Sequence, residues 1–324
     1  MTTLMARLAV ALTIGSATVS AQPVAPPIAP PGPAQSGPVN PLWHEQKTRN
    51  YLPHMTWPEV QDLRTRTDMV IIPIAAIEQH SLHLPIGTDF LNGLERAKLV
   101  AQRADALVAP ILLPGNSPYH MEFPGTISLS SQTIQQVYFE AAQSLMKHGF
   151  RRFLLINSHG GNQVITRYIA DRINQETEGI AVELGEAAAP FLTRAPQAAA
   201  PTGTVFDRHG GVGETSTALY MMPNLVDLAV ARRAALTMPE HLQKMLPEVV
   251  AGDPTATLVF LAEGLKAKST GKNTSTREMS DTGTWGVRDP HDATAEAGRR
   301  ETENFVQAAV KFIERWQQLR PMHR

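Results

Sequence analysis

Short apolar runs alternate with helix-period segments along most of this chain, and this alternation limits the available folds more than any other feature. The strand-like runs are residues 69–75, 107–113, 152–157 and 180–184. The helix-period segments include 91–106, 132–148, 163–175 and 293–319. Strands separated by helices form a parallel sheet, because each helix carries the chain back before the next strand begins. The sequence therefore predicts an α/β fold with its functional groups outside the carboxyl ends of the strands.

The composition fits a folded protein and argues against a nucleic-acid partner. The chain has 324 residues, 43% of them hydrophobic, which is enough for a full core in one large domain or two small ones. Its formal net charge is -1 and its pI is about 6.8. The sequence has no Lys/Arg cluster of the kind that follows a phosphate backbone. We therefore expect no binding to nucleic acid.

The N-terminus has the pattern of an export signal. Arg7 precedes an apolar run, and the small residues Val19 and Ala21 stand where a signal peptidase requires them, just before Gln22. Residues 1–21 are therefore predicted to be a signal peptide, and the protein to be periplasmic or secreted without membrane contact after cleavage. An uncleaved anchor is the alternative, although the apolar run is short for a bilayer span.

The next segment, residues 22–41, is too rich in proline to pack as helix or sheet. It is predicted to be an extended linker that leads to a folded domain over residues 42–324. The chain contains no cysteine. This fits an exported protein without disulfides, and it excludes a thiolate as nucleophile or metal ligand.

Titratable residues gather where three of the segments end. Glu78, His80 and Asp89 follow the first strand in IEQHSLHLPIGTD. His159 follows the third strand in NSHGGN, and HGGVGETS places His209 and Glu214 at the predicted start of a helix; glycines at such turns let side chains approach a shared point. On spacing alone, Glu78 and Asp89 could instead be a helix cap and a turn aspartate.

Imidazole and carboxylate groups without cysteine suit Zn²⁺, Mn²⁺ or Fe²⁺, and one carboxylate can bridge two such ions. A pair of bridged metals activates water at neutral pH and polarises a carbonyl group. A metal pair of this kind can hydrolyse an amide or a lactone.

Several motifs of the chain resemble those of the creatininase family. EQHSLHLPIGTD resembles the family's EQHGxHLPLxTD, NSHGGN its NGHGGN, and HGGVGETS its HAGxxETS. SPYHMEFPGTISL and GTWGVRDPHDAT are similar to two further family stretches in the same order, so that the resemblance runs from Thr56 to Gly298. It implies a three-layer α/β/α creatininase-like fold with a mostly parallel central sheet.

The resemblance also implies a ligand set for two divalent metal ions, zinc or manganese, with iron as a further candidate. Glu78 and His80 would each bind one ion, Asp89 would bridge both, and His159 would join Glu78. Creatinine amidohydrolases carry HYEN where this chain has His-Gly-Gly-Asn, and the glutamate of HYEN is a ligand that glycine cannot replace. The last ligand is therefore assigned to Glu214, as in family members with HAGxxETS.

The remaining assignments concern proton transfer and the substrate pocket. His209 would be the proton shuttle that protonates the leaving nitrogen, and His209 and Glu214 are the predicted catalytic residues. His83, His120 and Trp285 are candidates for the substrate pocket. His83 could instead support the ligands or the fold, and His120 could simply satisfy a backbone carbonyl. Arg288 is a further pocket candidate next to the C-terminal motif.

The predicted function is therefore that of an exported dinuclear metal-dependent amidohydrolase acting on a C–N bond of a small amide, either cyclic or open-chain. Creatinine, a formamide, a peptide end and a lactone all remain open as substrates. An exported metal-binding family member without turnover is the main alternative. A serine hydrolase is disfavoured, because the chain has no GxSxG nucleophile elbow. Family members commonly form hexamers, so self-association is expected as well.

Overall fold

The computed structural model describes residues 46–193, 206–264 and 275–322. The chain divides into two units, Met1–Gln46 and Lys47–Arg324, and the account below concerns the second. The predicted signal peptide (1–21) and linker (22–41) lie outside the described residues, so they remain predictions. Among the helices in the described ranges, none is long and apolar enough to cross a membrane.

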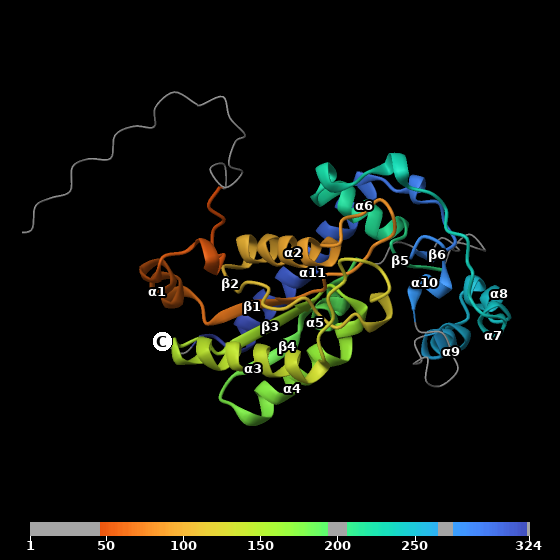
Figure 1. The fold of residues 1–324 in the computed structure, drawn as a ribbon. Helices are drawn as coiled ribbons and strands as arrows, with labels where there is room; N and C mark the ends of the chain where they lie inside the picture. The colour runs from red at the N-terminus through yellow and green to blue at the C-terminus, as the bar shows by residue number, and fades with distance from the viewer. Residues whose placement is uncertain (1–45, 194–205, 265–274, 323–324) are drawn as a thin grey trace, which may run out of the picture. The chain divides into compact units, whose positions relative to one another are not determined.

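A four-stranded parallel sheet forms the centre of the second unit. Its strands lie in the order β2-β1-β3-β4, and Figure 1 shows them side by side. Their bounds are β1 (Met69–Ile74), β2 (Leu107–Val108), β3 (Arg152–Asn157) and β4 (Ile180–Glu183). The predicted α/β class with a mostly parallel central sheet is confirmed.

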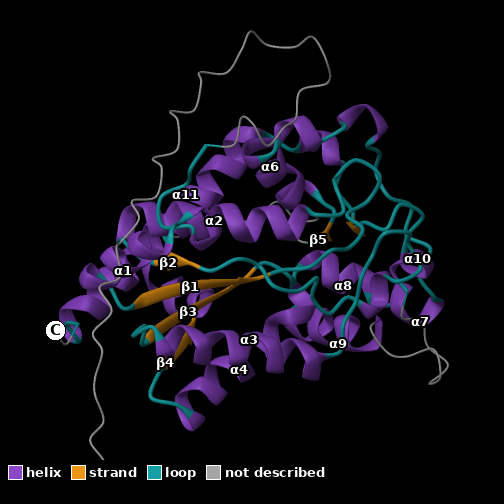
Figure 2. Ribbon diagram, turned by 60° about the vertical axis from the view of Figure 1, so that its left-hand side comes forward, coloured by secondary structure: helices purple, strands orange, loops and turns teal. Residues whose placement is uncertain are grey.

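Helices cover both faces of this sheet, as Figure 2 shows. Val70, Ile72 and Ile74 of β1 point into a core shared with α1 (Trp57–Arg66), α3 (Ser131–Lys147) and α4 (Gln163–Glu176). Met69 and Ile71 point the other way, into a core shared with α2 (Thr88–Ala104), α5 (Leu184–Ala188) and α11 (Ala295–Leu319). Because every β1 side chain is buried, the strand is continuously apolar, as expected of a parallel strand covered on both faces. The predicted three-layer arrangement is confirmed.

Local sequence explains where several helices begin. Thr56 and Glu59 form a capping box at the start of α1, with Pro58 in its first turn. The Ser130 side chain accepts a hydrogen bond from the backbone N–H of Thr133 at the start of α3. The same interaction between Thr294 and Ala297 opens α11. These caps fix the helices that flank the sheet.

One predicted strand is mostly absent. The prediction of a strand over 107–113 was wrong beyond Val108, where β2 ends. Pro110 lacks the N–H that a sheet ladder requires, and the N–H of Leu112 donates to Tyr138 Oη at 3.2 Å instead of to a strand. An apolar run alone did not distinguish a paired strand from a buried extended segment.

A second structural region follows the sheet in sequence. It contains the antiparallel pair β5 (Asp207–His209) and β6 (Trp285–Gly286) and the helices α7 (Glu240–Gln243), α8 (Leu246–Ala251), α9 (Pro254–Gly264) and α10 (Thr276–Met279). The helix α6 (Val212–Met221), which follows β5, packs instead against α11 and α2 beside the sheet. A separate small core holds the second region together, made of Phe206, Met238, Leu242, Val249, Phe260, Met279 and Trp285. We call the residues around this core the satellite region.

Single 3-10 turns connect many of these elements. They are η2 (Leu52–His54), η3 (Pro118–His120), η4 (Gly160–Asn162), η5 (Ala189–Phe191), η6 (Pro223–Leu225), η7 (Leu228–Val230) and η9 (Pro290–Asp292). Two of them, η3 and η4, carry residues of the site described next.

Candidate metal centre

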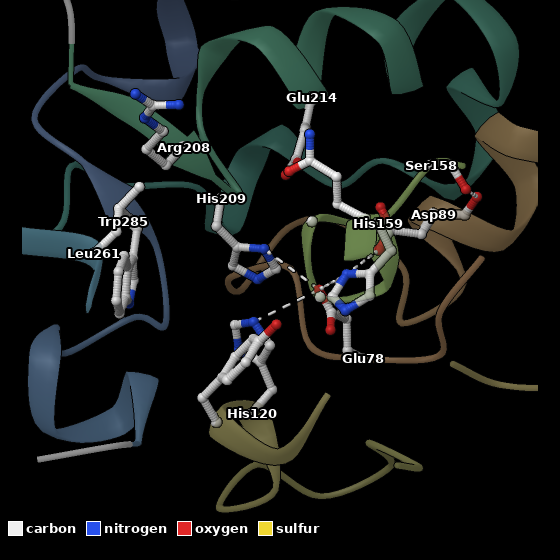
Figure 3. Close-up of a pocket in the computed structure, with 14 residues that line it drawn as sticks. Glu78, Asp89, His120, Ser158, His159, Arg208, His209, Glu214, Leu261 and Trp285 are labelled. Atoms are coloured by element: carbon white, nitrogen blue, oxygen red, sulfur yellow. Dashed lines mark hydrogen bonds and ion pairs between the residues drawn. The ribbon is translucent and has the colours of Figure 1, made fainter. Parts of the chain in front are cut away.

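The titratable residues meet at the carboxyl edge of the sheet. The chain runs from β1 to β2 on one side of the sheet and from β3 to β4 on the other side. The segments that follow the neighbouring strands β1 and β3 therefore diverge between them. Ligands of open α/β sheets bind at such a switch point. Glu78 and His80 follow β1, and His159 follows β3. Figure 3 shows Glu78, Asp89, His159 and Glu214 around the same pocket.

Two carboxylates come from the first turns of helices. Asp89 lies at the start of α2, and Glu214 lies at the start of α6. The positive end of a helix macrodipole stabilises a negative charge there. Both helices therefore favour the ionised, metal-binding form of these side chains.

Asp89 belongs to two groups that could hold a metal ion. In the first group, His159 Nδ1 lies 3.2 Å from Glu78 Oε1 and 3.1 Å from Asp89 Oδ2. In the second, His80 Nε2 lies 3.3 Å from Asp89 Oδ1 and 3.8 Å from Glu214 Oε2. The two oxygens of Asp89 thus face different groups, as in a carboxylate that bridges two ions.

A third group joins Glu78 and His80 to His209, whose Nδ1 lies 3.6 Å from Glu78 Oε1. His209 is the residue that the sequence assigned to proton transfer. Its position is close enough to the ligand atoms for ligation as well as for proton transfer.

Unsatisfied buried atoms provide a test of whether a metal fits. Four buried atoms of the site make no hydrogen bond: Glu78 Oε1 and Oε2, His80 Nε2 and Asp89 Oδ2. The imidazole nitrogens and carboxylate oxygens nevertheless lie close to one another. Each such atom costs about 1–3 kcal/mol when it lacks a partner. These are the same atoms that the groups above would offer to an ion, so a divalent metal fits the site.

Contacts on the far side of two imidazoles support the same assignment. His159 Nε2 donates to Asn116 O at 2.9 Å, and His80 Nδ1 donates to Glu78 O at 3.0 Å. A proton on those nitrogens leaves the lone pairs of His159 Nδ1 and His80 Nε2 for the centre. Metal-binding histidines are typically oriented in this way.

The electrostatics of the metal-free site couple the imidazoles to the carboxylates. Burial lowers the pKa of His80, but Asp89, Glu214 and Glu78 outweigh it and raise that pKa to about 10. The pKa of His159 is likewise raised against burial, by Glu78 and Asp89. The pKa of Glu214 is raised to about 7, because the effect of burial exceeds the opposing effect of the nearby His80. Protons therefore occupy the places that a metal cation would take.

Two further imidazoles in the site are neutral. Burial lowers the pKa of His209 to about 4, and the nearby charge of His80 adds to this effect. Burial also lowers the pKa of His120 well below its ordinary value, with His209 as the next cause. At neutral pH each of these rings has one N–H donor and one acceptor nitrogen.

Glycines allow two close approaches around the centre. A side chain at Gly161 would collide with Tyr119 Oη, with Asn116 O and with His159 Nε2. Gly210 has a φ of +60°, and a side chain there would press on Ser81. Ser81 itself has a φ of 66°, a left-handed conformation that residues other than glycine rarely adopt.

The pocket at this centre has a volume of about 320 Å³. Among the sequence-predicted pocket residues, His120 and Trp285 line it. His83 lies behind it, with Nε2 2.8 Å from Thr215 Oγ1. Arg288 does not line it and lies 4.0 Å from Asp292. The predicted metal ligands are brought together, and His83 and Arg288 are not placed in the pocket.

Other lining residues were not singled out from the sequence. They are Tyr119, Ser158, Gly160, Gly161, Gln163, Arg208 and Leu261. Tyr119, Ser158 and Arg208 each adjoin a histidine of the site, so adjacency to the motifs was an available signal. Leu261 lies on α9 in an apolar segment without any such signal.

A parallel α/β sheet with carboxylates and imidazoles converging at its switch point is the arrangement of a metal-dependent hydrolase. The sequence model described as creatinine amidohydrolase matches residues 53–313. The chain therefore belongs to the creatininase family, and the sequence resemblance is confirmed.

Individual relatives include enzymes of two kinds. The mycofactocin precursor peptide peptidase of Mycolicibacterium smegmatis is 27% identical over 265 residues, 79% of this chain and 89% of that protein. The creatinine amidohydrolase of Pseudomonas putida is 31% identical over 192 residues, 55% of this chain and 74% of that protein. A creatininase crystal structure superposes with a TM-score of 0.63 at 23% identity, covering 84% of this chain and 98% of that chain. Solved creatininase structures include a manganese form and a Zn-Zn form.

Proposed function

We propose that this protein is a dinuclear metal-dependent hydrolase that cleaves a C–N bond of an amide. The observation that carries the proposal is the position of Asp89, whose two carboxylate oxygens face two different groups of potential ligands. Glu78 and His159 would complete one ion site, and His80 and Glu214 the other. Zinc and manganese suit this donor set, and iron is a further candidate.

Bound divalent ions would supply Lewis acidity toward the amide carbonyl and an activated water at neutral pH. Residues of the chain would then transfer the proton from the water to the leaving nitrogen. His209 is neutral at pH 7, since burial lowers its pKa to about 4, and its Nδ1 faces Glu78 at 3.6 Å. It can accept a proton there and donate it to the leaving nitrogen.

Among the substrate classes left open by the sequence, a peptide end fits best. Gly160 is exposed on the pocket lining, and a side chain there would meet no atom within 4 Å, so the pocket is open on this side and a peptide could extend out of it. The relatives matched over most of their length include peptide peptidases. A small cyclic amide is the second candidate, favoured by the 31% identity to a creatinine amidohydrolase.

Export and self-association also belong to the proposal. The signal-like pattern of residues 1–21 supports a periplasmic or secreted protein. Val164 and Tyr168, exposed at 75% and 50% one turn apart on α4, form an apolar face that supports contact with further copies of the chain.

A hydrolysis screen of the protein loaded with zinc or manganese tests the function. The panel contains short peptides, N-acyl amino acids, creatinine, a formamide and a lactone. Release of amine from peptides at a rate well above that from creatinine would support the peptide-end assignment. Retention of about two metal equivalents per chain without turnover of any substrate would favour the non-catalytic alternative instead.

A further inference from the structure

A buried glutamine stands between the first two metal-binding candidates. Gln79 is 4% exposed, and its side-chain amide touches the imidazoles of His120 and His209. The orientation of the amide is fixed by two main-chain partners. Its Oε1 lies 2.8 Å from the N–H of Ser81, which can only donate, and its Nε2 lies 3.0 Å from the carbonyl oxygen of Gly283, which can only accept.

The main chain of Gln79 determines the tautomer of His209. His209 Nε2 lies 2.6 Å from the carbonyl oxygen of Gln79. A carbonyl oxygen only accepts, so Nε2 carries the proton. The other nitrogen, Nδ1, then has a lone pair and faces Glu78 Oε1 at 3.6 Å.

The side chain of Gln79 determines the tautomer of His120. One Nε2 hydrogen goes to Gly283, and His209 Nε2, at 3.1 Å, already carries a proton and cannot accept the other. The second hydrogen therefore goes to His120 Nδ1 at 2.9 Å, which must be unprotonated. The neutral ring then carries its proton on Nε2, which lies 3.6 Å from Glu78 Oε1.

The contact of His120 with Thr276 agrees with this assignment. The Thr276 hydroxyl lies 2.6 Å from His120 Nδ1 and 3.0 Å from the carbonyl oxygen of Tyr119, and it can donate to either. A proton on Nδ1 would instead place two N–H groups face to face, those of His120 and Gln79, at a separation of 2.9 Å.

We propose that Gln79 is a positioning residue that gives the two imidazoles opposite roles at the same centre. His209 presents an acceptor nitrogen, and His120 presents an N–H donor. The rings are stacked with centroids 4.2 Å apart and an interplanar angle of 25°, and Figure 3 shows both directed toward Glu78. The chemical roles of the two rings rest on the proposed function. His209 would accept the proton released by the attacking water. His120 Nε2 would donate a hydrogen bond to the carbonyl oxygen of the substrate amide as that oxygen gains negative charge.

The fold makes room for this amide. Gly283 has a φ of +86°, and a side chain there would collide with the Oε1 and Cδ atoms of Gln79. The main-chain carbonyl that orients Gln79 is thus in place only because residue 283 is glycine.

Nitrogen NMR of the histidine rings tests the tautomers directly. The zinc-loaded full-length protein is labelled with ¹⁵N-histidine, and its long-range ¹⁵N–¹H correlations identify the protonated nitrogen of each ring. The signals of His120 and His209 are assigned by their loss in H120N and H209N. We expect both rings to be protonated at Nε2. A proton on His120 Nδ1 in the wild-type protein would overturn the proposal.

The variant Gln79→Met removes the amide while keeping the length of the side chain. His120 should then lose its single tautomer, whereas His209 should keep the Nε2 proton, because its main-chain partner is unchanged. A His120 ring that stays protonated only at Nε2 would show that Thr276 suffices and would refute the role of Gln79. Gly283→Ala, which crowds the same amide, provides a second variant if Gln79→Met fails to fold.

The matched control is Gln243→Met. The Gln243 amide donates to Met238 O in the satellite region and contacts no imidazole. Both ring tautomers and the activity should remain as in the wild type.

Kinetics with the best amide from the substrate screen complete the test. Gln79→Met should lower kcat by roughly 10–100-fold with KM changed by less than about twofold, as for loss of an interaction made in the transition state. A rise in KM alone would refute the proposed donor role of His120. If the wild-type protein hydrolyses no amide, the proposed function fails, whereas the NMR result still decides the tautomers.

Discussion

The central sheet and the satellite region contribute different parts of the same centre. The sheet side supplies Glu78, His80, Asp89 and His159 from segments that follow β1 and β3. The satellite side supplies Trp285 from β6 and Leu261 from α9, and His209 at the end of β5 links the two. Buried parallel strands hold potential metal ligands in place, whereas a small separate core carries the groups that would face a substrate. Changes on the two sides should therefore have separable effects.

The largest effect should come from Asp89→Ala on the sheet side. Both potential ion sites share this carboxylate, so its loss should remove the bound metal and lower activity roughly 10⁴-fold or more. Elemental analysis per chain after dialysis measures the metal directly. A variant that kept both ions would show that Asp89 does not bridge them.

The next effect should come from His209→Ala at the start of the satellite side. We expect the metal to be retained and kcat to fall by about 10²–10⁴-fold, as for loss of a general acid–base group. Metal content and kcat measured on one preparation give the comparison with Asp89→Ala. Loss of metal would instead make His209 a ligand, which its place in the third group permits.

Metal binding should release protons from the sheet side. The pKa of His80 is raised to about 10 and that of His159 is also raised, yet a ligating imidazole must be neutral. Near pH 8, zinc should therefore displace about two protons per chain, measured by calorimetry in buffers of different ionisation enthalpy. Release of no proton would contradict these ligands.

The same shift predicts how the metal-free protein responds to pH. The folded pKa of His80 lies above its ordinary value of 6.5, so its contribution to stability is complete below that pH and is lost as pH rises toward about 10. The Tm of the metal-free protein should fall over this interval. The metal-bound protein should lack this loss, because His80 is already neutral there.

The smallest effect concerns the contact between the two sides. Ser81, after β1, adopts a φ of 66° and packs against Gly210, after β5. Ser81→Gly should stabilise the metal-free protein by roughly 0.5–1 kcal/mol by removing the left-handed strain. Urea unfolding measures the change. Ser81→Ala keeps the strain and serves as the control; equal stability of the two variants would mean that backbone strain is not the cause.

The two regions also differ in how far the sequence predicted them. The strand over 152–157 and the helix that follows it, α4, were found almost residue by residue, because a continuous apolar run and helix periodicity dominate there. The satellite elements were missed. β5 and β6 are short, and they pair across a long separation in sequence. Nothing local marks such a pairing.

The site shows the same division. The resemblance of the motifs to those of the creatininase family implied the ligands Glu78, His80, Asp89, His159 and Glu214, which the structure places together. His83 was a candidate for the substrate pocket, but the turn that follows β1 directs it toward Thr215. Gln79 was not among the predicted site residues, because its amide does not titrate. Its importance follows only from contacts with residues as distant in sequence as His209 and Gly283.

The crowding around Gly161 affects how this family could diversify. By the motif resemblance, creatinine amidohydrolases would carry their ligand glutamate where this chain has Gly161, and any side chain there would strike Tyr119 Oη. A single substitution at Gly161 would therefore be blocked while Tyr119 remains. Replacing the tyrosine alone would not open the space, because the main-chain oxygen of Asn116 and Nε2 of His159 would still collide with the new side chain. The two ligand arrangements are thus separated by a shift of the main chain, which no single side-chain replacement supplies.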